Sequence, residues 1–488
     1  MTILFRLHVL SSVFSLGALF LFCLLWLGGC AVGPDYNRPK IVVPESFKEV
    51  TPVVLGAGDW RIAQPGAIDV SPWWTVFNDP VLDALMPQLA AANPDIQTAR
   101  ANVRRARAAL REAMASFFPT LDAGGNASRG QTGGHAPVNN AYRAQLSASW
   151  ELDIFGGTRR SFEATSADRE ATEALLAQVL LSMRAELAQS YFQIRSLDEQ
   201  LELYVQTIAA YERSLAITNN QHAAGVALRI DVAQAEAQLQ GAKAQALALE
   251  LERRQVEHAI ASLLGLPPAL FDLKPAPISA KLPQIEGVLP STLLERRPDI
   301  ATVERQMAAA NARIGIAQSA YFPTFSLSGS GGYSAGVFAD WFTLPSRLWS
   351  VGSTAALKIF EAGALQAKTE QAVAVWEASV AAYRKAVLAA FREIEDQLAT
   401  IALLEQEEKV RHMAMKSSRE AESLAINQYR AGISSYLTVV TTQATALANA
   451  RSVAVLKGRR FIAAVAMIRA LGGGWYVEEA VETARSAE

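Results

Sequence analysis

Short stretches of the chain alternate between apolar and polar side chains, as β-strands do. In residues 143–154 the apolar positions fall on one face and the polar positions on the other, and residues 349–360 repeat the pattern. Period-two alternation is typical of any half-buried strand, so a soluble sheet would produce it too. These segments are long enough to cross a bilayer at a tilt. Their polar faces carry mostly small hydroxyls and glycines, as in a water-filled lumen, so we expect transmembrane strands.

Two longer regions, residues 157–224 and 364–431, follow a helical period with almost no helix breakers. In the second region apolar residues succeed one another by three or four, from Val373 through Tyr383 to Ile401. This near-3.5 spacing is the seam of helices that pack as in coiled coils. A helix of about 65 residues would be roughly 100 Å long.

Each long helix is followed by a glycine at which the chain can reverse. Gly225 and Gly432 allow tight turns, after which we expect second helices over residues 228–265 and 435–470. Such helices build a structural coiled-coil rod, or a tunnel if their polar faces turn inward around an axis.

The two halves of the sequence resemble each other. Residues 92–120 align without a gap on residues 296–324, sharing Pro-Asp-Ile near the start and Phe-Pro-Thr at the end, and NQHAAG at 220–225 matches NQYRAG at 427–432. Alanine-rich helices could share alanines by chance, but not both flanking motifs. The chain is therefore expected to be a tandem duplication with an offset of about 205 residues.

Each repeat has the same predicted order: a helix, a Phe-Pro break, two strands and two long helices. Pro119 and Pro323 end the first helix, because proline lacks the amide donor and restricts the residue before it. Residues 132–140 and 335–346 would connect the strands. Four strands cannot close a barrel, and an open sheet edge in lipid leaves backbone groups unpaired. If the strands span the membrane, several chains must share one barrel, and spacing alone allows a dimer or a trimer.

The N-terminus has the layout of a secretory signal. An apolar run follows a short start that carries Arg6, and it ends at Leu-Gly-Gly-Cys, which resembles the lipoprotein signal box with Cys30 as the lipidated first residue. A spanning helix would have a similar length, and Cys30 could also be a small apolar residue of a helix. Since Cys23 is the other cysteine, the mature chain could form no internal disulfide. We expect a bacterial envelope lipoprotein.

Composition excludes some functions. The formal net charge is −2, with 45 basic and 47 acidic residues, so no basic field indicates nucleic-acid binding. The five histidines are scattered, and the sequence has neither a metal-binding HExxH pair nor a Walker loop. We expect no catalytic residue, no metal and no cofactor other than the covalent lipid on Cys30.

Charged clusters are interpreted as structural. The pair Arg253-Arg254 is expected on a solvated helix face. Glu393, Glu395 and Asp396 stand close together in the sequence, but a helix directs their side chains to different sides of its axis. We therefore expect no catalytic pair among them.

Several motifs together resemble the TolC-like outer-membrane efflux proteins, in their lipoprotein branch. The resemblance rests on CAVGPDYNRP after the signal, SPWWTVFNDPVLDALMPQLAAANPDI at 71–96, LLERRPDI at 293–300 and AFREIEDQL at 390–398. It covers nearly the whole mature chain, in order and with the duplication.

The resemblance implies an α+β membrane protein in which three chains share one twelve-stranded β-barrel, continuous with a long twelve-helix α-barrel. Each chain would supply four strands and long coiled helices in two tandem repeats. The channel would sit in the outer membrane of a Gram-negative bacterium, lipid-anchored and extending into the periplasm. It would dock through the helix tips, marked by Gly225 and Gly432, with a periplasmic adaptor and an inner-membrane transporter, commonly of the proton-driven RND type.

In that family the tunnel narrows at the helix reversals, where acidic residues and a tyrosine contribute to the closed aperture. Tyr429 matches the tyrosine, whereas the first repeat has His222. Asp231 stands near the first reversal, but the corresponding positions of the second repeat are Thr438 and Thr441, where family members often carry aspartate. This departure predicts weaker block by cations than in relatives with an acidic ring.

The predicted function is a passive exit duct of a tripartite efflux system for small molecules. The alternative is a periplasmic coiled-coil adaptor or structural lipoprotein that links the two membranes, and a general diffusion porin is disfavoured by the helices. The predicted organisation is a signal peptide (1–29), an N-terminal linker (30–72), a first repeat (73–270), an inter-repeat linker (271–290), a second repeat (291–471) and a C-terminal tail (472–488).

Overall fold

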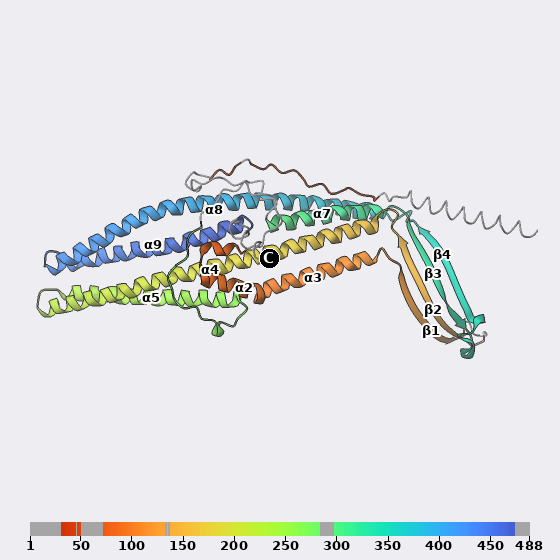
Figure 1. The fold of residues 1–488 in the computed structure, drawn as a ribbon, viewed down its shortest axis with the longest axis horizontal. Coiled ribbons are helices and arrows are strands. Elements are labelled where there is room, and N and C mark those ends of the chain that lie inside the picture. The colour runs from red at the N-terminus through yellow and green to blue at the C-terminus, as the bar shows by residue number, and fades with distance from the viewer. Residues whose placement is uncertain are drawn as a thin grey trace, which may run out of the picture. The chain divides into compact units, whose positions relative to one another are not determined.

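The computed structural model describes residues 31–44, 46–49, 72–131, 134, 137–283 and 297–473. A series of one helix, two strands and two long helices occurs twice among these residues (Figure 1). The first half contains η1 (Trp73–Phe77), α2 (Pro80–Ala92), α3 (Pro94–Ala115), β1 (Thr120–Gly130), β2 (Asn139–Leu152), α4 (Gly157–Ala223), α5 (Arg229–Leu263) and η2 (Pro268–Leu270). The second contains α7 (Pro298–Ser319), β3 (Thr324–Ala335), η3 (Phe338–Asp340), η4 (Leu344–Ser346), β4 (Arg347–Ala356), α8 (Ala364–Arg430) and α9 (Tyr436–Ala470).

Corresponding helices of the two halves have equal lengths. Helices α3 and α7 have 22 residues each, α4 and α8 have 67, and α5 and α9 have 35. The predicted order of helices and strands is therefore confirmed, and the predicted helix boundaries agree to within two residues. That the two halves arose by duplication stays a prediction from the sequence.

The chain divides into two compact units, which are described separately. Unit 1 comprises the described residues up to Lys40 together with Asn102–Thr172 and Thr302–Arg384. Unit 2 comprises the described residues of Ile41–Ala101, of Glu173–Ala301 and from Lys385 onward.

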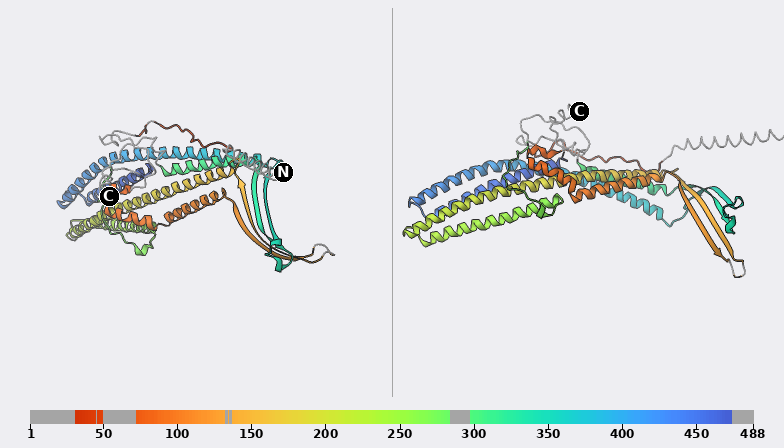
Figure 2. Two further views of the ribbon diagram at one scale, coloured as in Figure 1. Left: turned by 45° about the vertical axis from the view of Figure 1, so that its right-hand side comes forward. Right: turned by 60° about the horizontal axis from the view of Figure 1, so that its bottom comes forward.

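Unit 1 contains one antiparallel sheet with the strand order β1-β2-β3-β4 (Figure 2). The strands pair as two hairpins, and the pairing of β2 with β3 joins the two halves of the sequence. Strands β1 and β4 each have one edge without a partner among the described residues.

The register gives the sheet one apolar and one polar face. Directly paired residues have their side chains on the same face, and Ala123, Leu146 and Gly331 form one such row while Asp122, Ser147 and Ser330 form the next. The apolar positions predicted on separate strands therefore fall on a common face. That face carries Leu121, Ala123, Tyr142, Ala144, Leu146, Ala148, Trp150, Leu152, Phe325, Leu327, Tyr333, Trp349, Val351 and Ala355.

The predicted strand boundaries need correction. Strand β4 ends at Ala356, so Leu357 and Ile359 do not belong to it. Ala356 pairs with Thr324, the first residue of β3, and the chain before Thr324 turns at Phe322-Pro323 and offers no further partner. Strand β2 likewise stops before Ile154 and starts earlier than predicted, because pairing with β1 extends to Asn139.

The predicted seam of α8 is confirmed by its burial. Tyr383, Val387, Ile394 and Leu398 are buried, and the other predicted seam residues are half-buried. A strip of apolar residues spaced by three or four therefore packs against neighbouring helices along much of α8.

The main core of unit 2 surrounds η1 and α2. Rings of Phe77, Phe192 and Phe461 lie with centroids 4.8 to 6.2 Å apart, bringing η1, α4 and α9 together. Asp79 is buried and caps α2, its carboxylate accepting from the amides of Val81 and Leu82 at 3.0 and 3.2 Å. A buried carboxylate at a helix N-terminus satisfies amides that have no partner within the helix.

In each half, a side chain just before the helix that precedes the strands bonds to the end of the last helix. The Asn93 side chain, at the start of α3, donates to the carbonyl of Leu263 at the end of α5 (2.8 Å). Arg297, before α7, donates to the carbonyl of Ala470 at the end of α9 (2.6 Å). Two different side chains therefore supply the same contact, which satisfies a helix-terminal carbonyl.

Among the described residues, none of the helices combines the length and the apolar character needed to span a membrane.

Candidate functional site

The turn after α4 and the turn after α8 have the same backbone geometry. Gly225 and Gly432 adopt positive φ angles of 75° and 74°, a region that glycine enters without steric cost. The next amide donates to the carbonyl five residues back, Val226 to Gln221 and Ile433 to Gln428, both at 2.8 Å. With the glycine amides bonded to His222 and Tyr429, these are Schellman motifs. The predicted reversal at both glycines is confirmed.

The helices that follow these turns begin differently. In the first turn the Asp231 carboxylate accepts from the Leu228 amide at 3.0 Å, which caps α5. Thr438 occupies the same position of α9, three residues after Ser435, and Ser435 makes no side-chain capping bond. Thr438 and Thr441 are both exposed, and the Thr441 hydroxyl bonds to the Leu437 carbonyl of its own helix.

Tyr429 lies against a second tyrosine that the sequence analysis missed. The rings of Tyr429 and Tyr436 are 5.2 Å apart, and the Tyr436 hydroxyl lies 3.3 Å from that of Ser214 on α4. Burial raises the pKa of both tyrosines, and the negative charge of Asp231 raises it further, while the hydroxyl of Thr218 lowers it. The negative charge of Asp231 thus acts on both tyrosines, and the raised pKa keeps them neutral. The role of Tyr429 and Asp231 in a gate stays a prediction.

The first turn has no tyrosine at the position of Tyr429. His222 stands there, and its Nδ1 lies 2.9 Å from the Ala227 carbonyl within the turn. Arg229 occupies the position that corresponds to Tyr436. This difference between the halves was the signal from which the second tyrosine could have been found.

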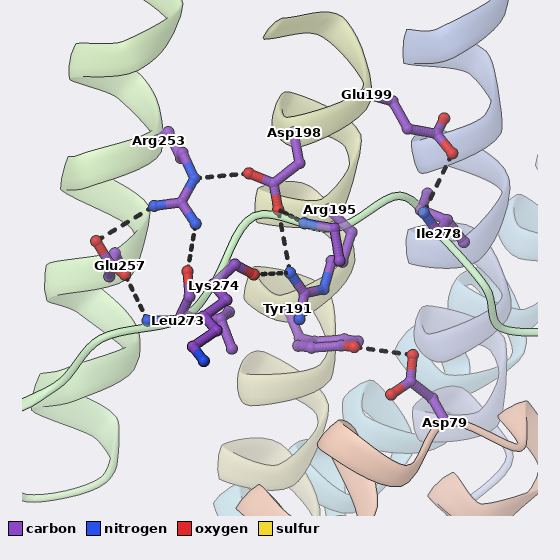
Figure 3. Close-up of polar contacts among 11 residues, drawn as sticks. Asp79, Tyr191, Arg195, Asp198, Glu199, Arg253, Glu257, Leu273, Lys274 and Ile278 are labelled. Carbon is purple, nitrogen blue, oxygen red and sulfur yellow. Dashed lines mark hydrogen bonds and ion pairs between the residues drawn. The ribbon is translucent and has the colours of Figure 1, made fainter. Parts of the chain in front are cut away.

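Charged side chains of α4 and α5 form a network that holds the segment after α5 (Figure 3). We call this network the clasp, and it consists of Arg195, Asp198, Glu199, Arg253 and Glu257. Asp198 of α4 is bonded to Arg253 of α5 at 2.6 Å and to Arg195 at 3.1 Å. Its second oxygen also accepts from the Ala276 amide at 3.0 Å. The Asp198 side chain is only 2 % exposed, so both its charge and its lone pairs are satisfied inside the protein.

The clasp holds segment 271–278 through its backbone. Arg253 donates to the Leu273 carbonyl and Arg195 to the Lys274 carbonyl, while Glu257 accepts from the Leu273 amide at 2.7 Å. Glu199 accepts from the Ile278 amide and from Lys457 of α9, so the segment is tied to α4, α5 and α9.

The clasp corrects the interpretation of the Arg253-Arg254 pair. Arg254 is exposed and paired with Glu250 one turn away, as expected for a solvated face. Arg253 is buried, because its partner Asp198 lies on another helix and the segment that covers it comes later in the chain. Side chains one residue apart point in different directions from a helix, which the sequence pair alone conceals.

Two of the sequence motifs meet in unit 2. Arg297 of the LLERRPDI motif bonds to Glu393 of the AFREIEDQL motif at 2.9 Å. Glu395 instead accepts from the amides of Lys48 and Glu49. These carboxylates therefore serve different partners. Within the described ranges, no group of three His, Cys, Asp or Glu side chains is placed to hold a metal ion.

The segment after Cys30 is fixed along unit 1. Arg160, at the start of α4, donates to the carbonyls of Val32 and Gly33 and pairs with Asp35 at 2.9 Å. Ala31 lies so close to Gly156 that a side chain at that glycine would collide with it. Cys30 itself lies outside the described residues, as do the predicted signal peptide and the C-terminal tail after Gly473.

Comparison with known proteins identifies the family. The model of the family "Outer membrane efflux protein" matches residues 85–266 and 289–473. The chain belongs to this family. It is 33% identical to the pyoverdine export outer membrane protein OpmQ of Pseudomonas aeruginosa, over 93% of this chain and 95% of that one. It is 32% identical to the outer membrane protein OprJ of the same species, over 92% and 94%.

A solved structure shows the same fold. The outer-membrane channel OprN is 30% identical to this chain, covers 91% of it with all of its own length, and superimposes with a TM-score of 0.83. As an outer membrane efflux protein, the chain is an efflux channel of the outer membrane, as the motifs predicted. The family is one of transport proteins, and the alternative of a periplasmic adaptor is not favoured.

The clasp of this outer membrane efflux protein can be tested with two neighbouring arginines. We expect Arg253→Met to lower the free energy of unfolding by about 3 kcal/mol, because it leaves the buried Asp198, Glu257 and the Leu273 carbonyl without this donor. Chemical denaturation of the detergent-solubilised full-length protein, followed by circular dichroism, measures the loss.

Arg254→Met is the matched control. It removes the same charge from an exposed pair and should change the free energy by no more than about 0.5 kcal/mol. Equal effects of the two substitutions would show that the clasp contributes nothing beyond a surface ion pair.

Proposed function

We propose that three copies of the chain form one channel, in which a twelve-stranded barrel in the outer membrane continues into a twelve-helix tunnel in the periplasm. The observation that carries this proposal is the four-stranded sheet with one apolar face and two open edges. In lipid each unpaired backbone group costs several kcal/mol, so the edges of β1 and β4 must pair with other copies. Four strands from each of three chains satisfy the lower limit of about eight strands, and the family resemblance favours three chains over two.

In this arrangement the apolar face of the sheet meets lipid and the polar face lines the lumen. Leu146 and Trp150 would contact the membrane, whereas Ser147, Ser149 and Glu151 would face water. Small hydroxylated side chains leave the lumen open and bind no particular compound strongly, as expected of a passive exit duct.

The helical part would receive cargo from a periplasmic adaptor and an inner-membrane pump, commonly of the RND type. The exposed turns at Gly225 and Gly432 are the proposed docking points. Relatives are named for different cargoes, pyoverdine in one case and toluene in another. We therefore propose that the choice of small molecule is made mainly by the pump.

Electron microscopy of the detergent-extracted full-length protein tests the proposed assembly. End-on and side views should show a hollow tube of threefold symmetry, more than about 100 Å long, given the rise of a 67-residue helix. Twofold particles would contradict the trimer, and thin rods or monomers would contradict a shared barrel.

Covalent lipid on Cys30 is proposed for the N-terminus. Its neighbour Ala31 packs at Gly156, between the end of β2 and the start of α4, which is where the membrane boundary would lie. Acyl chains at this point would enter the inner leaflet beside the barrel, and two or more chains give stable anchoring.

Metabolic labelling with an alkyne-bearing palmitate should mark the wild-type protein and leave Cys30→Ser unlabelled. The intact mass of the mature wild-type chain should exceed that of residues 30–488 by the lipid. Labelling of both proteins would place the lipid elsewhere, and labelling of neither would exclude it.

The proposed periplasmic gate consists of Tyr429 and Asp231 with Thr438 and Thr441 on the exposed face of α9. Three copies would present hydroxyls at the threonine positions, where an acidic ring would attract multivalent cations. We expect hexaamminecobalt(III) to block channels of the native protein weakly in planar bilayers. The double variant Thr438→Asp/Thr441→Asp should reach half block at a hexaamminecobalt(III) concentration about tenfold lower than the native protein needs. Carboxylates placed close together produce a strong negative potential, which raises the local concentration of the cation.

Ser452→Asp is the control for position, since it adds one carboxylate per chain about three turns further along α9 from Thr441. It should leave block weak. Native channels that are blocked as strongly as the double variant would contradict this account of the gate.

A further inference from the structure

The connection between β3 and β4 is an ordered loop of residues 336–346, which we call the aromatic loop. It contains the two short helices η3 and η4. The Asp340 carbonyl accepts from the hydroxyls of Thr343 and Ser346 at 2.8 and 2.7 Å, and from the Thr343 amide at 3.2 Å. Local hydrogen bonds therefore hold the loop in one shape.

The aromatic loop folds onto the apolar face of the sheet. Phe338 and Trp341 lie 5.5 and 5.7 Å from the ring of Tyr142, and Phe342 lies 5.6 Å from the ring of Tyr333. Both tyrosines are on the apolar face, because Tyr142 pairs with Ala335 and Tyr333 with Ala144. The loop thus extends the apolar face at the end of the sheet away from the Phe-Pro breaks.

Large apolar side chains of the loop remain exposed after these contacts form. Val337, Phe338, Phe342 and Leu344 are 58 to 77 % exposed. Asp340 is the one ionisable residue of the loop. Exposed apolar side chains gathered in one patch mark an interaction surface.

Two arginines flank the patch on the same face. Arg347 pairs with Tyr333 across β3 and β4, and Arg129 lies two residues beyond Ala127, the partner of Tyr142. Both are exposed, and neither forms an ion pair with any residue in the described part of the chain. Exposed aromatic rings can contact an apolar surface, and the guanidinium groups beside them can bind anionic groups. The patch therefore suits a partner that is apolar in one part and anionic in the adjoining part.

We propose that the aromatic loop is an anchor in the outer leaflet of the outer membrane, with its rings at headgroup depth and Arg347 and Arg129 on phosphate groups of the outer-leaflet glycolipid. This inference rests on the proposed function, in which the apolar face of the sheet meets lipid. A second copy would pair at the edges of β1 and β4 and would not cover this face. The lipid that covers the apolar face of the sheet in the proposed function would also reach the loop. Aromatic residues are enriched at membrane–water interfaces, where their rings sit at the level of the headgroups.

The depth of the loop is measured with cysteine variants of the full-length protein, each labelled with a fluorophore and reconstituted in phosphatidylcholine vesicles. The quencher is phosphatidylcholine that carries a nitroxide either near the headgroup or at mid-chain. For Phe342→Cys and Leu344→Cys we expect about twofold stronger quenching by the headgroup nitroxide, because interfacial rings sit at that depth. The unsubstituted protein is the control for labelling.

Two neighbouring residues of β2 separate the failure of this inference from the failure of the proposed function. Leu146→Cys, on the apolar face, should be quenched more by the mid-chain nitroxide, and Ser147→Cys, on the polar face, by neither. If Leu146→Cys is quenched but the loop variants are not, the loop lies in water and the anchor is wrong. If Leu146→Cys is also unquenched, the proposed membrane face is wrong as well.

The phosphate contact is tested with lipid A, a phosphorylated glycolipid, added to the detergent-solubilised protein. We expect lipid A to raise the melting temperature, and Arg347→Gln to lose at least about half of that rise, since a guanidinium binds phosphate bidentately. Arg143→Gln makes the same change on the polar face of β2 and should keep the full rise. Equal rises in the two variants would overturn the assignment of phosphate to Arg347.

Discussion

The pairing of β2 with β3 is the interaction on which the architecture of unit 1 depends. It joins the two hairpins, and its register runs from Tyr142 opposite Ala335 to Leu152 opposite Phe325. Because side chains alternate along a strand, a slip by one residue would move every apolar side chain of one hairpin to the polar face of the other. The strands approach so closely at Gly332 that a Cβ there would collide with the Ala144 carbonyl, which opposes the slip that would put Tyr333 in its place.

The same pairing leaves a requirement that one chain cannot meet. Strand β1 is exposed along all of its residues, and its free edge, like that of β4, presents amide and carbonyl groups without partners in the described sheet. In water such an edge would be a site of aggregation, and in lipid it would be prohibitive. In the proposed membrane-spanning sheet, the need for further copies follows from backbone hydrogen bonding alone. The side chains then decide which face of the assembled sheet meets the lipid.

Periodicity predicted what depends on local sequence and missed what depends on distant pairing. The seam through Tyr383, Val387 and Ile394 was visible because a helix places residues three or four apart on one face. Arg253 was assigned to a solvated face because its partner, Asp198, lies 55 residues earlier in the chain. The aromatic loop was expected only as a connection. Its contact with Tyr142 depends on the strand register, which no local pattern specifies.

The two turns at the helix ends show how the halves of the sequence could diverge without changing the fold. Both turns are closed by backbone hydrogen bonds and a glycine at positive φ, so neither needs a particular side chain to reverse the chain. Asp231 caps α5 from the third position, yet α9 begins without a side-chain cap at Ser435. A missing cap costs about 1 kcal/mol, which a 35-residue helix packed against its neighbours can lose. The fold of the turn therefore sets no requirement on the side chains at Thr438 and Thr441, which leaves both positions available to the proposed gate.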